Sequence, residues 1–242
     1  MKILFIPRSR VLIAAFLLML FMLLPVVRPT MFYERWREEI YRPGLSGKLV
    51  MIDPGHGGAD PGAVAGGVIE KNINLAVSQA LQLELRHNGV KSMLTREEQG
   101  GLNPQTRMTF LERYRNLLAR KDLAVDERAH VFVSIHTNSN EERRASGGIV
   151  YYNPDNPYNN ILAESIQEEL NKLYQTSRSA EKADFTVISQ NGMPAALVET
   201  GFITNPADRK KLTDAGFRQA IARAVHRGLI KYAAKLPGSN KT

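Results

Sequence analysis

The chain of 242 residues contains no cysteine, and this absence excludes several kinds of chemistry at once. Without thiols the protein has no disulfides, no thiolate metal ligands and no mechanism that uses a cysteine nucleophile. Internal repeats and low-complexity tracts are absent as well. After an unusual N-terminal segment, about 195 residues remain, a length that suits one α/β domain and is too short for two.

The sequence also has no concentrated basic stripe in its folded part. The formal net charge is +8, but residues 1–47 carry seven Lys or Arg against three Glu, and residues 48–242 carry 25 against 21 Asp or Glu. A nucleic-acid-binding domain would gather its positive charge on one surface, whereas basic pairs such as Arg143 and Arg144 stand among acids. We therefore expect a solvated surface and no nucleic-acid partner.

The N-terminal segment has the pattern of a membrane anchor. Lys2, Arg8 and Arg10 precede an apolar run over residues 11–27, which spans roughly 25 Å as a helix. We expect residues 1–10 to be a cytoplasmic basic segment, residues 11–27 a transmembrane signal-anchor and residues 28–47 a charged stalk. Residues 25–30 offer no pair of small residues for a signal peptidase, so an uncleaved anchor is favoured over a cleaved signal.

Residues 48–236 are expected to form the folded domain, with a disordered tail at 237–242. Nearly continuous apolar runs at residues 49–52, 131–135 and 195–198 are typical of strands covered on both faces. Residues 90–95, 149–152 and 185–188 are plausible further strands. Helical periodicity marks segments that open at Glu70, cover 104–120 and 162–173, and close the chain at 217–232. The pattern predicts an α/β domain with a mixed, mostly parallel sheet of about six strands and helices on both faces.

Three of the predicted strands are followed closely by a residue that can bind a metal or transfer a proton. The first is followed by His56, the second by His136 and the third by Glu199, while Glu70 opens the helix after the first strand. Ligand crevices of open α/β sheets lie beyond the carboxyl ends of the strands. We therefore expect these four residues to meet at one edge of the sheet.

Two histidines and one carboxylate form a known catalytic zinc set with an open position for water. A further carboxylate that does not bind the metal supplies the proton transfer that a hydrolase needs. Each residue also has a structural interpretation: a turn histidine for His56, a capped strand end for His136, a helix-dipole acid for Glu70 and a paired buried carboxylate for Glu199. Asp53 either orients His56 or caps the loop, and His87, His130 and His226 are expected to be structural.

Four segments resemble the signature segments of the zinc-dependent N-acetylmuramoyl-L-alanine amidases, the amidase-3 family of bacteria. They begin at Asp53 (DPGHGG), Glu70 (EKNIN), Ser134 (SIHTN) and Val198 (VETGFITN), and the likeness covers residues 47–234 in the family's order. Only residues 97–130 fit loosely. The resemblance implies zinc ligands at His56, Glu70 and His136, a catalytic acid at Glu199, and cleavage of the amide between the muramic acid lactyl group and L-alanine of the stem peptide.

The resemblance also implies partners and a place in the cell. The substrate would be peptidoglycan glycan strands with their stem peptides, at the extracytoplasmic face of the bacterial membrane. A bare domain on a short anchor resembles the spore-cortex amidases that begin muramic δ-lactam formation, which would place the enzyme in the forespore intermembrane space. Two rivals stay open: a catalytically silent peptidoglycan-binding protein, and a zinc peptidase or deacetylase.

The segment after His136 bears on access to the site. Only ten residues, 137–146, precede the next predicted strand, and such a loop is too short to form a covering helix. We expect an open crevice lined in part by this loop. Restraint of the enzyme would then come from the anchor, the timing of synthesis or a separate regulatory protein.

Overall fold

A six-stranded sheet forms the centre of the computed structural model, which describes residues 44–97, 109–189 and 191–237. The strands, in spatial order, are β4 (Lys91–Leu94), β1 (Leu49–Pro54), β5 (Val131–Asn138), β8 (Ala195–Phe202), β6 (Ile149–Tyr152) and β7 (Glu181–Lys182). The first four run parallel, β6 is antiparallel to β8, and β7 runs parallel to β6. The predicted mixed, mostly parallel sheet of about six strands is confirmed.

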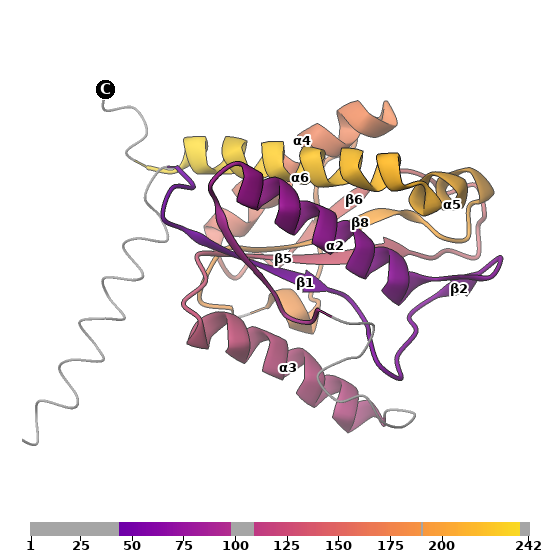
Figure 1. Cartoon of the computed structure of the whole chain (residues 1–242), viewed down its shortest axis with the longest axis horizontal. Helices are drawn as coiled ribbons and strands as arrows, with labels where there is room; N and C mark the ends of the chain where they lie inside the picture. Colours follow the sequence, from indigo (N-terminus) through magenta and orange to yellow (C-terminus); the bar gives the residue numbers. More distant parts are fainter. Residues whose placement is uncertain (1–43, 98–108, 190, 238–242) are drawn as a thin grey trace, which may run out of the picture. The chain divides into compact units, whose positions relative to one another are not determined.

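Helices lie on both faces of this sheet (Figure 1). One face is covered by α2 (Glu70–His87), α4 (Pro157–Tyr174) and α6 (Ala215–Lys235), and the other face by α3 (Phe110–Asp126). Three short elements complete the fold: the hairpin of β2 (Val64–Ala65) and β3 (Val68–Ile69), the 3-10 helix η1 (Thr186–Ile188), and α5 (Pro206–Thr213). Helix α3 packs near η1. This second face is covered by fewer helices than the first.

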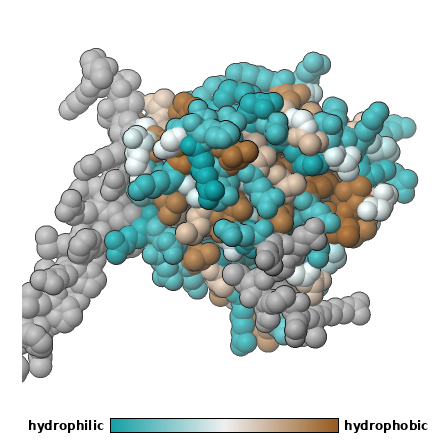
Figure 2. All heavy atoms as spheres, viewed as in Figure 1, coloured by the Kyte–Doolittle hydropathy of each residue, from teal (hydrophilic) through white to brown (hydrophobic). Residues whose placement is uncertain are grey.

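Burial on both faces explains why the central strands are almost continuously apolar. Val50 to Ile52 in β1 and Val131 to Val133 in β5 are fully buried. On the three-helix face, α6 approaches α4 so closely that a Cβ at Gly228 would lie 2.5 Å from the Ile166 Cα. The face seen in Figure 2 is largely hydrophilic with separate hydrophobic patches, as expected for a domain whose apolar residues are mostly interior.

Two predicted elements differ from the observed ones. Residues 185–188 do not form a strand: Thr186–Ile188 is the 3-10 helix η1, with Val187 and Ile188 buried, and the sixth strand is β7 instead. A short apolar run cannot distinguish these two conformations. The helix expected over 104–120 is α3, which begins after a capping box formed by Thr109 and Glu112 and continues to Asp126.

The expected anchor at 11–27, with the basic segment before it and most of the stalk, lies outside the described residues, as does the tail from residue 238. Among the residues that are described, no helix has both the length and the apolar character needed to cross a bilayer.

Candidate metal and catalytic site

The four predicted residues come together at the carboxyl ends of the central strands. His136 near the end of β5 stands in register with Glu199 on the neighbouring β8. His56 follows β1, and Glu70 is the first residue of α2, which starts at this same edge. The parallel order β1-β5-β8 is therefore what gathers side chains that are up to 143 positions apart in the sequence.

Glu70 lies between the two histidines. Its Oε1 is 3.1 Å from His56 Nε2 and 3.2 Å from His136 Nδ1, and ligand atoms of the three residues lie within 4.8 Å of one another. Backbone amides orient this carboxylate: the N–H of Thr137 donates to Oε1 and that of Ala63 to Oε2. The three side chains form a group that can hold one metal ion.

The surroundings of the group also fit a bound ion. Two imidazole nitrogens and one carboxylate match the ligand types that zinc accepts in hydrolases. The side chains of His56 and His136 are 25% and 18% exposed, so a further ligand can reach them from solvent. A Cβ at Gly55 would lie only 2.3 Å from the His136 ring, so glycine is required there for the loop to approach its neighbour.

Asp60 is a site residue that the sequence analysis missed. Its Oδ2 lies 2.9 Å from His56 Nδ1, and its Oδ1 accepts from the N–H of Gly62. Burial lowers the pKa of His56, but Asp60 and Glu70 outweigh it and raise the value to about 9. A carboxylate on Nδ1 leaves Nε2 free for a metal and fixes the orientation of the ring. The sequence hint of this contact was the position of Asp60, four residues after His56.

Asp53, by contrast, contacts Arg120, Thr95 and Ser134 and not His56, so it does not orient that ring directly but supports the loop through Arg120. Its Oδ1 accepts from Arg120 at 2.8 Å and from Thr95 at 2.6 Å, and Oδ2 accepts from Ser134. Although burial raises the pKa of Asp53, the Arg120 charge and these hydrogen bonds hold it below its usual range. Asp53 is the buried anchor of an arginine.

That arginine fixes the loop bearing the first histidine. Arg120 donates to the carbonyl of Pro54 at 2.8 Å and to that of His56 at 2.7 Å, while Arg96 donates to the carbonyls of Pro54 and Gly55. His56 has a φ of 61°, a conformation that is costly for a residue other than glycine. The hydrogen bonds from the two guanidinium groups hold the loop in this conformation.

Replacing Arg120 with methionine is expected to lower the free energy of unfolding of the metal-free protein by about 3–5 kcal/mol, because Asp53 is left buried without its cation. Urea denaturation measures the change. The double variant Asp53→Asn with Arg120→Met should be more stable than Arg120→Met alone, since the buried side chain that loses Arg120 is then uncharged. A loss below about 1 kcal/mol in the single variant would contradict this account of the loop.

Glu199 faces the group without joining it. The residue is half-buried, yet its Oε2 is fully buried and has no hydrogen-bond partner among the described residues. Burial, followed by the nearby charge of Glu70, raises the pKa of Glu199 to about 8, while His56 acts in the opposite direction. A buried carboxylate oxygen without a partner is costly in a purely structural position, which favours a role in handling protons.

A cavity of about 470 Å³ opens onto these residues. Its walls include His56, His136 and Glu199, residues of α3 such as Leu117, and the segment 184–187. Residues 137–146, which were expected to line the crevice, are not among the residues that line this cavity, and α3 and the η1 segment line it instead. In the part of the chain that the structure describes, the cluster stays accessible to solvent, and α3 forms a wall of the cavity.

The remaining histidines lie outside this site. Nδ1 of His130 accepts from the backbone N–H of Leu49, and His226 lies 3.4 Å from Glu84. His87 is exposed at the end of α2. Their positions leave His56 and His136 as the two histidines of the site.

Comparisons with known proteins agree with this geometry. Residues 50–231 match the family model Amidase_3, N-acetylmuramoyl-L-alanine amidase. The chain is 32% identical over 191 residues to the germination-specific N-acetylmuramoyl-L-alanine amidase of Bacillus subtilis, with 78% of this chain and 81% of the relative covered. Among solved structures, the CwlD amidase of Clostridioides difficile in complex with the GerS lipoprotein gives a TM-score of 0.73 at 34% identity, covering 77% and 98% of the two chains. The catalytic domain of CwlV from Bacillus (Paenibacillus) polymyxa gives 0.66 at 29% identity, covering 76% and 97%.

Proposed function

The chain belongs to the N-acetylmuramoyl-L-alanine amidase family, and on this premise we propose that it hydrolyses the amide between the lactyl group of muramic acid and L-alanine in peptidoglycan. The observation that carries the proposal is the placement of Glu199 in register with His136, beside a group of three potential metal ligands. All four residues fall within the matched segment. A hydrolase needs both a metal site and a separate proton carrier, and this edge of the sheet offers both.

We propose Zn²⁺ as the metal, held by His56, Glu70 and His136. When bound, zinc would supply Lewis-acid polarisation of a carbonyl and would acidify water at neutral pH. Asp60 keeps the ring of His56 in a fixed orientation through its contact with Nδ1. The absence of cysteine leaves imidazole and carboxylate as the ligand types for such a site, and these are the types present.

Glu199 is proposed as the catalytic acid and base. Its buried Oε2 would take a proton from the attacking water and return it to the departing nitrogen of L-alanine. The residue is suited to this exchange because burial and Glu70 raise its pKa well above that of an exposed glutamate. Removal of the proton makes water a better nucleophile. Delivery of the same proton to the L-alanine nitrogen lets the amine leave in neutral form.

The products identify the reaction. Purified protein should release from isolated peptidoglycan peptides that begin with a free L-alanine amine, and a chelator should abolish their release. Mass spectrometry of the digest separates the rivals: new amines inside the stem peptide indicate a peptidase, free acetate indicates a deacetylase, and no product indicates a silent binding protein.

We further propose a role in spore cortex maturation, at the start of muramic δ-lactam formation. The support is the likeness to the germination-specific relative and to CwlD, whose matched chain is covered over 98% of its length. Expressing this chain in a spore former that lacks its own germination-specific amidase should restore δ-lactam in the cortex. Cortex without δ-lactam, despite active protein, would refute the role.

The similar CwlD amidase was solved with a lipoprotein, and on that likeness we propose that a separate regulatory protein acts on this chain as well. The regulator's expected effect is on activity rather than on folding, because the site group is assembled within the chain itself. Purified protein that reaches the same turnover on cortex peptidoglycan with and without sporulation lysate would contradict this.

The proposed anchor predicts a topology outside the cytoplasm. Residues 11–27 should remain on the mature protein, with residues 48–242 on the extracytoplasmic side, because the basic start is retained in the cytoplasm. N-terminal sequencing of membrane-extracted protein should find the start at or near Met1. A start near residue 30 would instead identify a cleaved signal and a released enzyme.

A further inference from the structure

Asn74 is a fully buried polar residue one helical turn after Glu70 on α2. Asparagine is a poorer helix former than alanine or leucine, and a buried amide is costly unless its polar groups find hydrogen-bond partners. Here Nδ2 donates to Glu70 Oε1 at 3.1 Å and to the carbonyl of Gly55 at 3.3 Å, and Oδ1 accepts from the Thr137 hydroxyl at 2.9 Å. Both ends of the amide are therefore paired inside the domain.

Each partner of Asn74 belongs to a different one of the three segments that carry the proposed metal ligands. One partner is the ligand Glu70 itself, the second directly precedes His56, and the third directly follows His136. One side-chain amide thus connects the start of α2, the loop after β1 and the end of β5.

The chemistry of the partners fixes the orientation of this amide. A carboxylate and a backbone carbonyl only accept hydrogen bonds, so the NH2 group must be the end that faces Glu70 and Gly55. The amide oxygen then faces Thr137 and receives the single hydrogen of its hydroxyl group. Loss of that hydroxyl would leave the amide oxygen without this donor.

The Glu70 carboxylate is the group that this arrangement holds in place. Its Oε1, which both histidines approach, accepts from the Asn74 amide and from the N–H of Thr137. We infer that Asn74 is a positioning residue, which orients Glu70 between the two histidines and ties the three ligand-bearing segments together. Side chains that orient a metal ligand in this way change metal affinity by about 10- to 100-fold. The inference rests on the proposed zinc site and adds a residue that acts through its ligands.

The test measures zinc affinity and coordination geometry, and it does not depend on activity. Asn74→Ala should raise the Kd for zinc by about 10- to 100-fold in a titration against a competing chelator, because Glu70 loses a donor that orients it. The visible absorption bands of bound Co²⁺ depend on the geometry of its ligands. These bands should differ between Asn74→Ala and the unaltered protein, both loaded with Co²⁺ in place of zinc.

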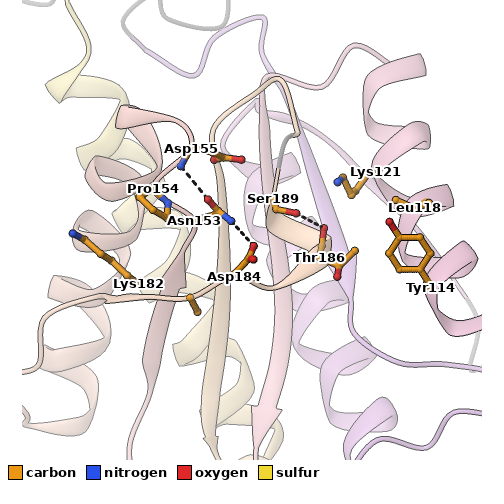
Figure 3. A pocket seen from close by; sticks show the side chains of 11 residues that line it. Tyr114, Leu118, Lys121, Asn153, Pro154, Asp155, Lys182, Asp184, Thr186 and Ser189 are labelled. Atoms are coloured by element: carbon orange, nitrogen blue, oxygen red, sulfur yellow. Dashed lines mark hydrogen bonds between the residues drawn. The ribbon is translucent and has the colours of Figure 1, made fainter. Parts of the chain in front are cut away.

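Asn159 on α4 provides the matched control, because it is also buried and its side chain also makes three hydrogen bonds. It donates to Asn153 and Asp155, which line a second cavity (Figure 3) and do not line the cavity at the metal group. Asn159→Ala should lower the free energy of unfolding of the metal-free protein but keep the unaltered Kd for zinc and the unaltered Co²⁺ bands. An equal loss of zinc affinity in the two variants would trace the effect to general destabilisation and overturn the inference.

A second pair of variants tests the same contacts with Asn74 in place. Thr137→Val removes the hydroxyl that donates to the amide oxygen, while Thr200 keeps a partner in the carbonyl of His136. Thr137→Val should weaken zinc binding. Thr137→Ser, which keeps a hydroxyl, should restore the affinity to near that of the unaltered protein.

Three outcomes decide between the inference and the metal site on which it rests. If the unaltered protein binds zinc and Asn74→Ala has the same Kd and the same Co²⁺ bands, the inference is overturned and the metal site stands. If Asn74→Ala does not fold, equal Kd values for Thr137→Val and Thr137→Ser overturn the inference. If the unaltered protein binds no zinc, the proposed metal site itself fails.

Discussion

Replacing Glu199 with glutamine is expected to lower turnover by about 100-fold or more while the bound metal and the fold persist. The amide has nearly the shape of the carboxylate, so packing at the end of β8 is retained. It cannot accept and return a proton, however, and the buried Oε2 position is where that exchange is proposed. Turnover on peptidoglycan, metal content by mass spectrometry and circular dichroism together measure the three parts of this result.

A suitable control for this variant is Glu181→Gln, which removes the charge of an exposed glutamate on β7 in the same sheet. Its turnover should equal that of the unaltered protein. Near-normal turnover in Glu199→Gln would show that Glu199 is structural and that another group moves the proton. Loss of metal in this variant would instead place Glu199 among the ligands.

Replacing His56 or His136 with alanine is expected to remove most of the bound zinc and with it nearly all activity. The unaltered protein should hold about one zinc ion per chain, because three ligand atoms converge within 4.8 Å. Removing one imidazole leaves a two-residue site, and incomplete sites bind zinc far more weakly. Zinc content after dialysis, measured for each variant, provides the readout.

His87→Ala serves as the matched control, because His87 is exposed at the end of α2 and lies outside the group. It should keep full zinc content and activity. Full zinc occupancy in both His56→Ala and His136→Ala would refute the proposed ligand set, whatever their activity.

The sequence was sufficient to predict which four residues meet, and the reason is topological. Parallel strands bring their carboxyl ends to one edge of the sheet, so each histidine or glutamate that follows an apolar run could be assigned to that edge from the sequence alone. The register of His136 with Glu199 confirms that they are neighbours on adjacent strands. Their catalytic and metal-binding roles remain proposals.

The supporting contacts could not be predicted in this way. Arg120 reaches Asp53 across 67 positions of sequence, and no local pattern indicates such a partner. Asp60 follows His56 by four residues, but the intervening glycines allow many loop conformations. The prediction of a strand at residues 185–188 was wrong for another reason. The few apolar residues of this segment suit a strand and a buried 3-10 turn equally well, and packing near α3 decides between the two.

Hydrolysis of peptidoglycan in water enriched in oxygen-18 tests the central claim most directly. An amidase that cleaves between the lactyl group and L-alanine places one labelled oxygen in the lactyl carboxylate and none in the released peptide. We expect mass spectrometry of the separated glycan and peptide products to show this distribution, and to show no labelled product in the presence of a chelator. Label in a carboxylate of the peptide, or in acetate, would contradict the account and identify a peptidase or a deacetylase.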